Sequence, residues 1–294
     1  MGLKKSKMLS LLFRKRRLIQ IGSLIFLIVI PLLNLLNLEV VTGNYYSLRI
    51  WKIEFVDPLF ALQHLLLTLK FNWQLLMGIS IPLLIAFLGG KLFCSFICPY
   101  NLLAEWLQKI LPAKKTNVFK VNAKRYWAVL IGWIILTVIA GFPILYFVSM
   151  PGQIGVFLGD LIFLKVMGVE SLMILAVLGI DVVFLKRIWC RELCPVGALL
   201  QRFHWNYGLK INYNEIDCVC STDEIDSPCV QRCPVYLNPK SDLLYPACFN
   251  CGECVKECYY YGEALKIKFI KDITNFEPNF KQRKEEQTIN KEEA

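Results

Sequence analysis

The sequence predicts a membrane all-α domain, with four transmembrane helices in two parallel repeats, followed by a small C-terminal α+β domain. Three observations predict it: an apolar composition, a repeated cysteine motif and a second group of closely spaced cysteines. Of the 294 residues, 56% are hydrophobic and 19% are charged, whereas soluble domains average about 45 to 50% apolar and about 25% charged residues. This composition also excludes a disordered chain.

Four long apolar runs lie within the first 185 residues. Each is close to the roughly 20 residues that cross a bilayer as a helix. They extend from Leu18 to Leu38, from Trp73 to Phe93, from Tyr126 to Met150 and from Val169 to Leu185. Two shorter apolar segments, Asp57 to Leu69 and Gln153 to Leu164, are expected to form short helices at the outer interface.

The lysine and arginine residues are distributed unequally around these runs. Of the 33, 29 lie before the first run, between the second and the third, or after the fourth. By the positive-inside rule, these segments are cytoplasmic. We therefore expect a multi-pass protein of the inner (cytoplasmic) membrane, in contact with lipid, with both termini in the cytoplasm. The net charge of +10 follows from this topology, so no nucleic-acid partner is expected.

A cysteine motif is repeated at the inner ends of the second and fourth runs. Residues 91–100 read KLFCSFICPY and residues 187–196 read RIWCRELCPV, so each position recurs 96 residues later. Both copies follow the same order of run, outer segment, run and Cys-x3-Cys-Pro, which makes the repeat parallel. Pro99 disfavours helical geometry at Cys98 and suits the first position of a new helix. Each cysteine pair should therefore lie at a helix break, near free amide N–H groups.

All twelve cysteines lie at or beyond the inner ends of the second and fourth runs. The cytosol is reducing, so metal ligation is favoured over disulfides. Near the C-terminus the spacing C-x2-C-x2-C-x3-C is typical of a [4Fe–4S] motif whose fourth cysteine ligates a second cluster. Its members are Cys248, Cys251, Cys254 and Cys258. The C-terminal domain is thus predicted to be of the bacterial two-cluster ferredoxin type.

A partner motif lies upstream, and cross-ligation divides the eight cysteines of this domain between two [4Fe–4S] clusters. The first cluster takes Cys218, Cys220, Cys229 and Cys258, and the second takes Cys233, Cys248, Cys251 and Cys254. The first set departs from the two-cluster ferredoxin pattern in two ways. It contains an insertion from Ser221 to Pro228, and Tyr259 follows Cys258 where the pattern has proline. One of Cys218 and Cys220 is therefore a bystander in an alternative interpretation.

The four remaining cysteines belong to the repeated motif: Cys94, Cys98, Cys190 and Cys194. If the two halves face each other, their thiolates converge on a third metal centre. Two other interpretations stay open. The four cysteines are either buried structural residues at a helix corner or members of a redox-active dithiol pair.

Haem is not expected as a cofactor. His64 and His204 belong to opposite ends of the membrane domain, and the chain has no Cys-x-x-Cys-His motif for covalent haem. In the repeat, His64 aligns with Asp160. Ionisable groups at membrane depth are often functional, so this pair is a candidate for accepting quinol protons. In the alternative interpretation, both residues cap short helices in the wet interface, and the catalytic residues are unknown.

The two Cys-x3-Cys-Pro motifs and the double ferredoxin region resemble those of NapH/MauN-type membrane iron–sulfur proteins. The resemblance covers residues 18 to 269. It implies electron transfer between the quinone pool, or a membrane partner, and a redox partner protein, with or without a role as a quinol dehydrogenase component. A similarity to CcoG-type proteins implies the alternative, a maturation factor that reduces a metal ion or thiol during metalloenzyme assembly.

The predicted organisation has four parts. They are a basic cytoplasmic N-terminus (1–17), a membrane domain of two repeats (18–207), a two-cluster ferredoxin-like domain (208–270) and a charged tail (271–294).

Overall fold

The computed structural model is mostly helical, and it describes most of the chain. The described residues are 13, 15–36, 41–51, 53–70, 73–111, 122–163, 168–184, 187–203, 208–215, 217–220, 226–241, 244–245 and 247–269. The predicted basic terminus up to residue 12, His204, residues 221–225 of the insertion and the charged tail lie outside these ranges.

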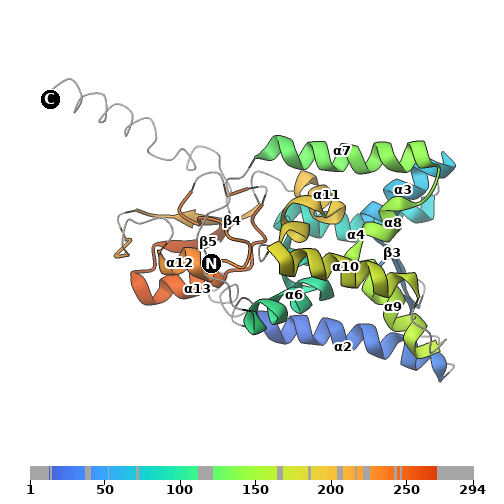
Figure 1. Cartoon of the computed structure of the whole chain (residues 1–294), viewed down its shortest axis with the longest axis horizontal. Coiled ribbons are helices and arrows are strands. Elements are labelled where there is room, and N and C mark those ends of the chain that lie inside the picture. Colours follow the sequence, from blue (N-terminus) through green and yellow to red (C-terminus); the bar gives the residue numbers. More distant parts are fainter. Residues whose placement is uncertain are drawn as a thin grey trace.

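Four long helices run along the long axis of the molecule, with α2 and α7 on opposite sides of the helical half (Figure 1). They are α2 (Arg16–Leu35), α4 (Trp73–Gly89), α7 (Ala123–Ala140) and α10 (Val169–Phe184). Each corresponds to one of the predicted apolar runs. Among the described residues, α2 is the one helix that is both long and apolar enough by itself to cross a membrane.

The third apolar run is not one helix, which corrects the predicted span from Tyr126 to Met150. The helix α7 ends at Ala140, where Gly141 adopts a left-handed cap with φ of 59°. Glycine takes this conformation without the steric cost of a Cβ. A short helix α8 (Ile144–Val148) and then α9 (Met150–Phe163) follow.

The second run also ends earlier than predicted. The helix α4 stops at Gly89, Gly90 has φ of 60°, and a separate short helix α5 (Leu92–Phe96) carries the first cysteine of the repeat. The two outer segments are helical as expected, in α3 (Pro58–Thr68) and α9.

A three-stranded antiparallel sheet between α2 and α3 was not predicted. Its strands are β1 (Val41–Gly43), β2 (Ser47–Ile50) and β3 (Ile53–Val56), in the order β1-β2-β3. The turn between β1 and β2 packs inward, because Tyr46 is buried and its ring stacks on Tyr146 at 4.3 Å. The turn therefore anchors a partly exposed sheet to the packed interior of the helical half.

The repeated cysteine motifs lead into short amphipathic segments. In the first repeat, α5 is followed by α6 (Pro99–Ile110). In the second repeat, a π-helical turn η1 (Trp189–Leu193) is followed by α11 (Pro195–Phe203). Both α6 and α11 begin at the proline of the motif, as expected from the preference of proline for the first helical position.

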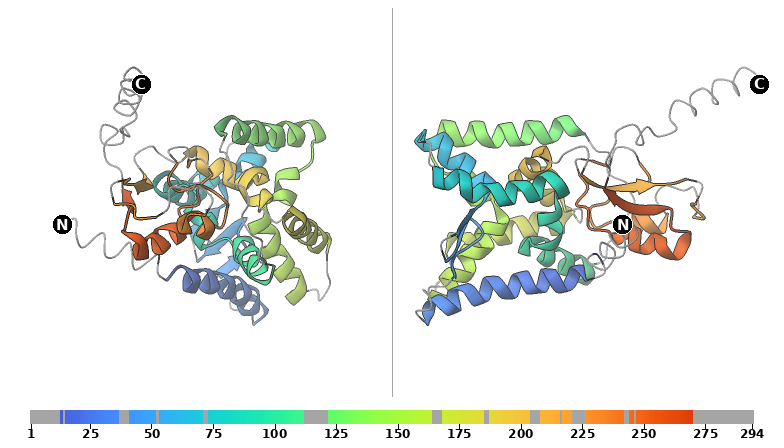
Figure 2. Two further views of the ribbon diagram at one scale, coloured as in Figure 1. Left: turned by 60° about the vertical axis from the view of Figure 1, so that its left-hand side comes forward. Right: turned by 180° about the vertical axis from the view of Figure 1, so that it is seen from behind.

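The C-terminal domain is a small α+β unit at one end of the molecule (Figure 2). It contains β4 (Leu209–Tyr213), α12 (Pro228–Arg232), α13 (Glu253–Cys258), a 3-10 turn η2 (Tyr259–Tyr261) and β5 (Leu265–Phe269). The two strands pair antiparallel, with Ile211 opposite Ile267. This two-stranded sheet supports the cysteine-bearing loops and helices.

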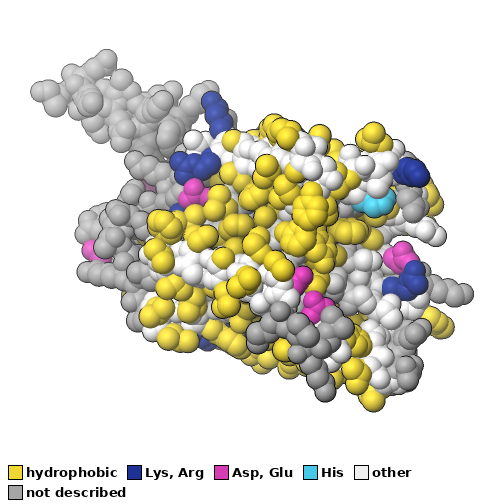
Figure 3. Space-filling model, turned by 45° about the vertical axis from the view of Figure 1, so that its right-hand side comes forward, with side chains coloured by type: hydrophobic (Ala, Val, Ile, Leu, Met, Phe, Trp, Pro, Cys, Tyr) yellow, Lys and Arg dark blue, Asp and Glu magenta, His cyan; other side chains and the backbone are white. Residues whose placement is uncertain are grey.

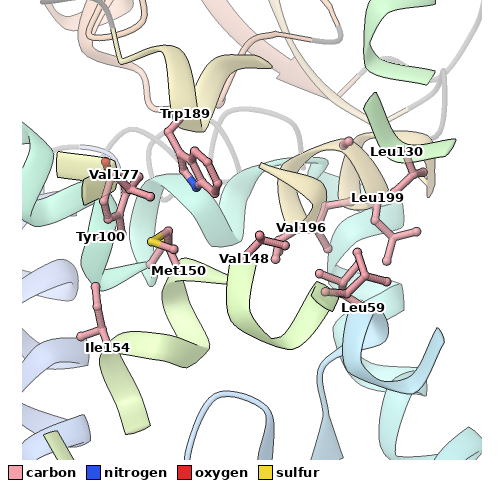
Figure 4. Packing of buried hydrophobic residues seen from close by; sticks show 14 of the residues in the cluster. Leu59, Tyr100, Leu130, Val148, Met150, Ile154, Val177, Trp189, Val196 and Leu199 are labelled. Carbon is pink, nitrogen blue, oxygen red and sulfur yellow. The ribbon is translucent and has the colours of Figure 1, made fainter. Parts of the chain in front are cut away.

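Buried apolar side chains form one cluster in each half. The cluster of the helical half includes Tyr100, Met150, Trp189 and Val196 (Figure 4). These four residues also line a cavity beside the cysteine motifs. The second cluster lies between β4, β5 and α13, and it also includes Tyr126 from α7. Tyr126 therefore joins the two halves through apolar packing.

A buried arginine also joins the two halves. Arg16 at the start of α2 is 2% exposed and donates from Nε to the backbone oxygen of Ser95 at 3.0 Å. Its guanidinium forms ion pairs with Glu105 of α6 and, at 3.1 Å, with Glu253 of α13. These contacts fix the ferredoxin-like domain against the end of the helical half that carries the cysteine motifs.

Candidate metal centres

The second predicted cluster set occupies the loop before α13, the first turn of α13 and the end of α12. Between Cys248 and Cys254, Asn250 and Gly252 have positive φ angles of 51° and 73°, so the loop bends tightly. Backbone amides point at the sulfurs: Asn250 N–H donates to Cys248 Sγ at 3.4 Å, and Leu237 N–H donates to Cys233 Sγ at 3.4 Å. Such N–H···S bonds are a normal feature around iron–sulfur clusters.

These four cysteines lie together and are all buried. Burial raises the pKa of the Cys254 thiol, and three neighbouring thiols add to this rise. They belong to Cys251, Cys233 and Cys248. Four buried thiolates require a positively charged centre between them, which is what an iron–sulfur cluster supplies. The donor set therefore fits a [4Fe–4S] cluster at the predicted residues.

The first predicted set also comes together, nearer the surface. Burial raises the pKa of the Cys229 thiol to about 11, and Lys240 opposes this rise. The thiols of Cys220 and Cys258 add to it. Burial and the thiol of Cys218 raise the pKa of Cys220. Both Cys218 and Cys220 are thus close to the other members, and both are half-buried.

The four cysteines of the repeated motif line one cavity in the helical half. The lining comprises Cys94, Cys98, Cys190 and Cys194 together with residues that include Tyr100, Met150, Trp189, Gly197 and Phe249. The two repeats therefore face each other at these motifs. The walls are mainly apolar, which excludes water from the space between the sulfurs.

In the first repeat, the helix break directs amide groups at sulfur. Cys98 is the N-cap of α6 with extended geometry, and Pro99 occupies the first helical position. The N–H groups of Asn101 and Tyr100 hydrogen-bond the Cys98 thiol. A helix N-terminus favours negative charge through its free N–H groups, so this geometry suits a thiolate.

The second repeat reproduces this arrangement. Cys194 is extended, and Pro195 begins α11. The N–H groups of Gly197 and Val196 hydrogen-bond the Cys194 thiol. These donors are the counterparts, 96 residues later, of those in the first repeat.

Within the described part of the chain, no three His, Cys, Asp or Glu side chains are placed to hold a single metal ion.

The predicted quinol pair is not joined by a hydrogen bond or an ion pair among the described residues. His64 Nδ1 lies 3.4 Å from Thr68 Oγ1 on its own helix. Asp160 is at the end of α9, near Gly168. Their role in proton transfer stays a prediction.

Two buried cations at the four-cysteine cavity were not given a role by sequence reasoning. Lys91 and Arg187 are each 1% exposed. The signal in the sequence was a basic residue three positions before the first cysteine of both motif copies.

Comparisons with known proteins agree with the repeat. Residues 71–117 and 167–212 each match the family described as "4Fe-4S binding domain". The two matched segments begin 96 residues apart and enclose Cys94 and Cys98 in one copy, and Cys190 and Cys194 in the other. The chain is 28% identical to the ferredoxin-type protein NapH of Escherichia coli over 237 residues, which cover 74% of this chain and 76% of NapH.

The chain is a homologue of the NapH and MauN ferredoxin-type proteins. It is 33% identical to the methylamine utilization ferredoxin-type protein MauN of Methylobacillus flagellatus over 156 residues, covering 52% of this chain and 53% of MauN. The MauN of Methylorubrum extorquens is 28% identical over 250 residues, covering 83% of this chain and 73% of MauN. No solved structure matches the chain. The predicted resemblance is confirmed, and the NapH/MauN homologue is a ferredoxin-type iron–sulfur electron-transfer protein.

Proposed function

We propose that this NapH/MauN homologue is a membrane-bound electron carrier between the quinone pool, or a membrane partner, and a redox enzyme. It carries two [4Fe–4S] clusters in the C-terminal domain and a third centre at Cys94, Cys98, Cys190 and Cys194. Both termini are cytoplasmic, and α2, α4, α7 and α10 are the four membrane spans.

The surface of the helical half supports membrane placement. Apolar side chains cover most of the face seen in Figure 3. Ile139 of α7 is exposed by 79%, and Leu172 and Val183 of α10 are exposed by 68% and 76%. Large contiguous apolar surface is rare on soluble monomers, and lipid would cover it.

The position of Phe249 is the observation that carries the proposal. Phe249 lines the four-cysteine cavity, and it directly follows Cys248, a member of the second ferredoxin-type set. That second set in turn adjoins the first, since Cys229 lies close enough to Cys254 to influence its thiol. The three cysteine sets thus form a continuous series from the interior of the helical half to the exposed end of the ferredoxin-like domain.

An iron–sulfur cluster, when bound, accepts and releases one electron at a time, so a series of three suits long-range electron transfer. The chain's own contribution is to hold each set of thiolates, to direct amide N–H groups at the sulfurs and to exclude water. The exposed end includes Cys218, Cys220 and Val219, whose side chain is 81% exposed. A soluble redox partner has direct access to this end.

The quinol side of the proposal concerns protons. Oxidation of a quinol releases two protons and two electrons, so a group at membrane depth must accept protons. His64 and Asp160 remain the proposed acceptors. Each occupies a helix of the outer segments, and each is partly exposed.

Quinol-dependent reduction tests this function. The full-length protein in nanodiscs is mixed anaerobically with a water-soluble quinol analogue, and cluster reduction is followed by electron paramagnetic resonance. We expect reduction of the ferredoxin-type clusters in the native protein and at least a tenfold slower rate in Cys190→Ser. Lys124→Met, which alters an exposed residue of α7, serves as the control.

The maturation-factor alternative gives a different result in the same experiment. If quinol leaves the clusters oxidised while a chemically reduced protein passes electrons to a metal ion or a protein disulfide, the carrier proposal is wrong and the alternative replaces it.

A further inference from the structure

Two buried cations at the four-cysteine cavity have donor atoms without partners. Lys91 and Arg187 are each 1% exposed. Within the described residues, Lys91 Nζ and the Nε and Nη2 atoms of Arg187 have no hydrogen-bond partner. A buried charge without a partner is strongly unfavourable. An anionic group that faces these atoms would remove the penalty.

The internal repeat relates the two cations. Arg187 follows Lys91 by 96 residues, and each precedes the first cysteine of its motif by three positions. Arg187 Nη1 donates to Asn101 Oδ1 of the other repeat at 2.8 Å. Reciprocally, a Cβ added at Gly197 would lie 3.6 Å from Lys91 Cε. Since Gly197 is the counterpart of Asn101, each cation lies next to the equivalent position of the other repeat.

The thiols are the ionisable neighbours of these cations. Lys91 interacts with Cys94, Cys194 and Cys190, in that order, and then with Cys248 of the ferredoxin-like domain. Arg187 interacts with Cys98 and Cys190. Each cation also lies next to a residue that lines the cavity, Arg187 next to Asn101 and Lys91 next to Gly197. Together their charges act on all four cysteines.

The nearby carboxylate of Asp181 interacts electrostatically with Arg187, but both of its oxygens bind other groups. Its Oδ2 accepts a hydrogen bond from Tyr100 OH at 2.7 Å, and its Oδ1 accepts one from Trp189 N–H at 3.0 Å. Within the described residues, no ion pair joins Asp181 to Arg187. Asp181 therefore leaves Lys91 Nζ and Arg187 Nε and Nη2 without an acceptor, and an anion in the cavity would supply one.

We infer that Lys91 and Arg187 are the paired counter-cations of an anionic metal centre held by Cys94, Cys98, Cys190 and Cys194. This inference rests on the proposed third centre. Four thiolates around a [4Fe–4S] core of charge +2 leave a net charge of −2, and one cation from each repeat neutralises it. Each repeat thus supplies two thiolates and one positive charge.

Lys91 has a second relationship that Arg187 does not share. Its ammonium lies 5.4 Å from the centroid of the Phe249 ring and 4.8 Å from that of Tyr126. It also interacts with Cys248. Lys91 therefore stands between the cavity and the second ferredoxin-type set, and its charge acts on both.

The electrostatic consequence has a definite sign. One-electron reduction makes a centre more negative, so a nearby buried cation favours the reduced state and raises the midpoint potential. Removal of the cation lowers the potential. Lys91→Met should lower the potentials of the cavity centre and of the Cys248 cluster, whereas Arg187→Gln should lower that of the cavity centre alone.

The test uses the full-length protein, purified anaerobically, with iron and sulfide analysis and a redox titration with dithionite followed by electron paramagnetic resonance. For Lys91→Met we expect the ratio of oxidised to reduced cavity centre at a fixed potential to rise at least tenfold. This corresponds to a fall in midpoint potential of about 59 mV for one electron. Lys91→Arg and Arg187→Lys keep the charge and should restore the potentials. The exposed-site variant Lys124→Met should change none of them.

The outcomes separate this inference from the proposed function. A native protein with about eight iron atoms overturns the third centre, and the inference falls with it. A native protein with about twelve iron atoms, and unchanged potentials in both neutral variants, overturns the inference alone. Loss of four iron atoms in Lys91→Met but not in Lys91→Arg supports it, because Lys91→Arg keeps the positive charge and Lys91→Met removes it. Equal loss in both variants contradicts it, because shape rather than charge would then matter.

Discussion

Arg187 of the second repeat donates a hydrogen bond from Nη1 to Oδ1 of Asn101 in the first repeat, at 2.8 Å. Both residues are 1% exposed, so the contact lies in the interior where the two repeats meet. The matching approach of Lys91 to Gly197 makes the interface reciprocal. Each repeat therefore completes the cysteine site of the other, and neither half alone contains all of the proposed ligands.

The first prediction concerns the ferredoxin-like domain. Cys251→Ser should remove the second cluster, so that iron and acid-labile sulfide each fall by about four per chain. The domain should also lose stability, because units below about 70 residues depend on such cross-links. Metal analysis and thermal unfolding measure both effects. A variant with unchanged iron content would show that Cys251 is not a ligand.

The second prediction concerns topology. Trp51 is 81% exposed at the turn between β2 and β3, so a short reporter inserted there should be tolerated and should be periplasmic. A reporter after Ala294 should be cytoplasmic, because 29 of the 33 lysine and arginine residues lie on that side. Reporters on the same side of the membrane at both sites would contradict the four-span topology.

The third prediction concerns Arg16, which ties α2 to both Glu105 and Glu253. Arg16→Met leaves two carboxylates without their buried partner, and breaking such a pair costs about 3–5 kcal/mol. We expect a lower melting temperature and faster hydrogen exchange in α13. Arg17→Met, at an exposed neighbouring position, should be close to neutral. Equal effects of the two substitutions would exclude a special role for Arg16.

The fourth prediction concerns the packing of α9 against Tyr46, in the turn between β1 and β2. A Cβ at Gly152 would lie 2.1 Å from the ring of Tyr46, and Tyr46 is buried. Gly152→Ala should destabilise the helical half by about 1–3 kcal/mol, as overpacking does. Gly132→Ala provides the control, because nothing lies within 4 Å of its added Cβ. Indistinguishable melting temperatures would contradict the packing of Tyr46 against α9.

The features that the sequence predicted well depend on local signals. Apolar runs located the four long helices, and the proline of each motif located the starts of α6 and α11. The ferredoxin-type spacing predicted which cysteines lie together, because the ligand loop is short.

The features that were missed depend on tertiary contacts. The strands β1 to β3 have three or four residues each, too few for a clear alternation of polar and apolar residues. The break at Gly141 was masked by continuous apolar sequence on both sides. The convergence of the four motif cysteines was one of the open interpretations and was not missed, but it depended on how the two repeats pack, which the spacing within each motif does not determine. The burial of Lys91 and Arg187 follows from the same packing.

Metal analysis of a double variant tests the third centre most directly. Cys94→Ser combined with Cys98→Ser removes the first repeat's ligands and leaves all eight ferredoxin-type cysteines in place. We predict about twelve iron atoms per chain in the native protein and about eight in the variant, with the resonance signals of the ferredoxin-type clusters retained. The same iron content of about eight in both proteins would contradict a third centre in the cavity.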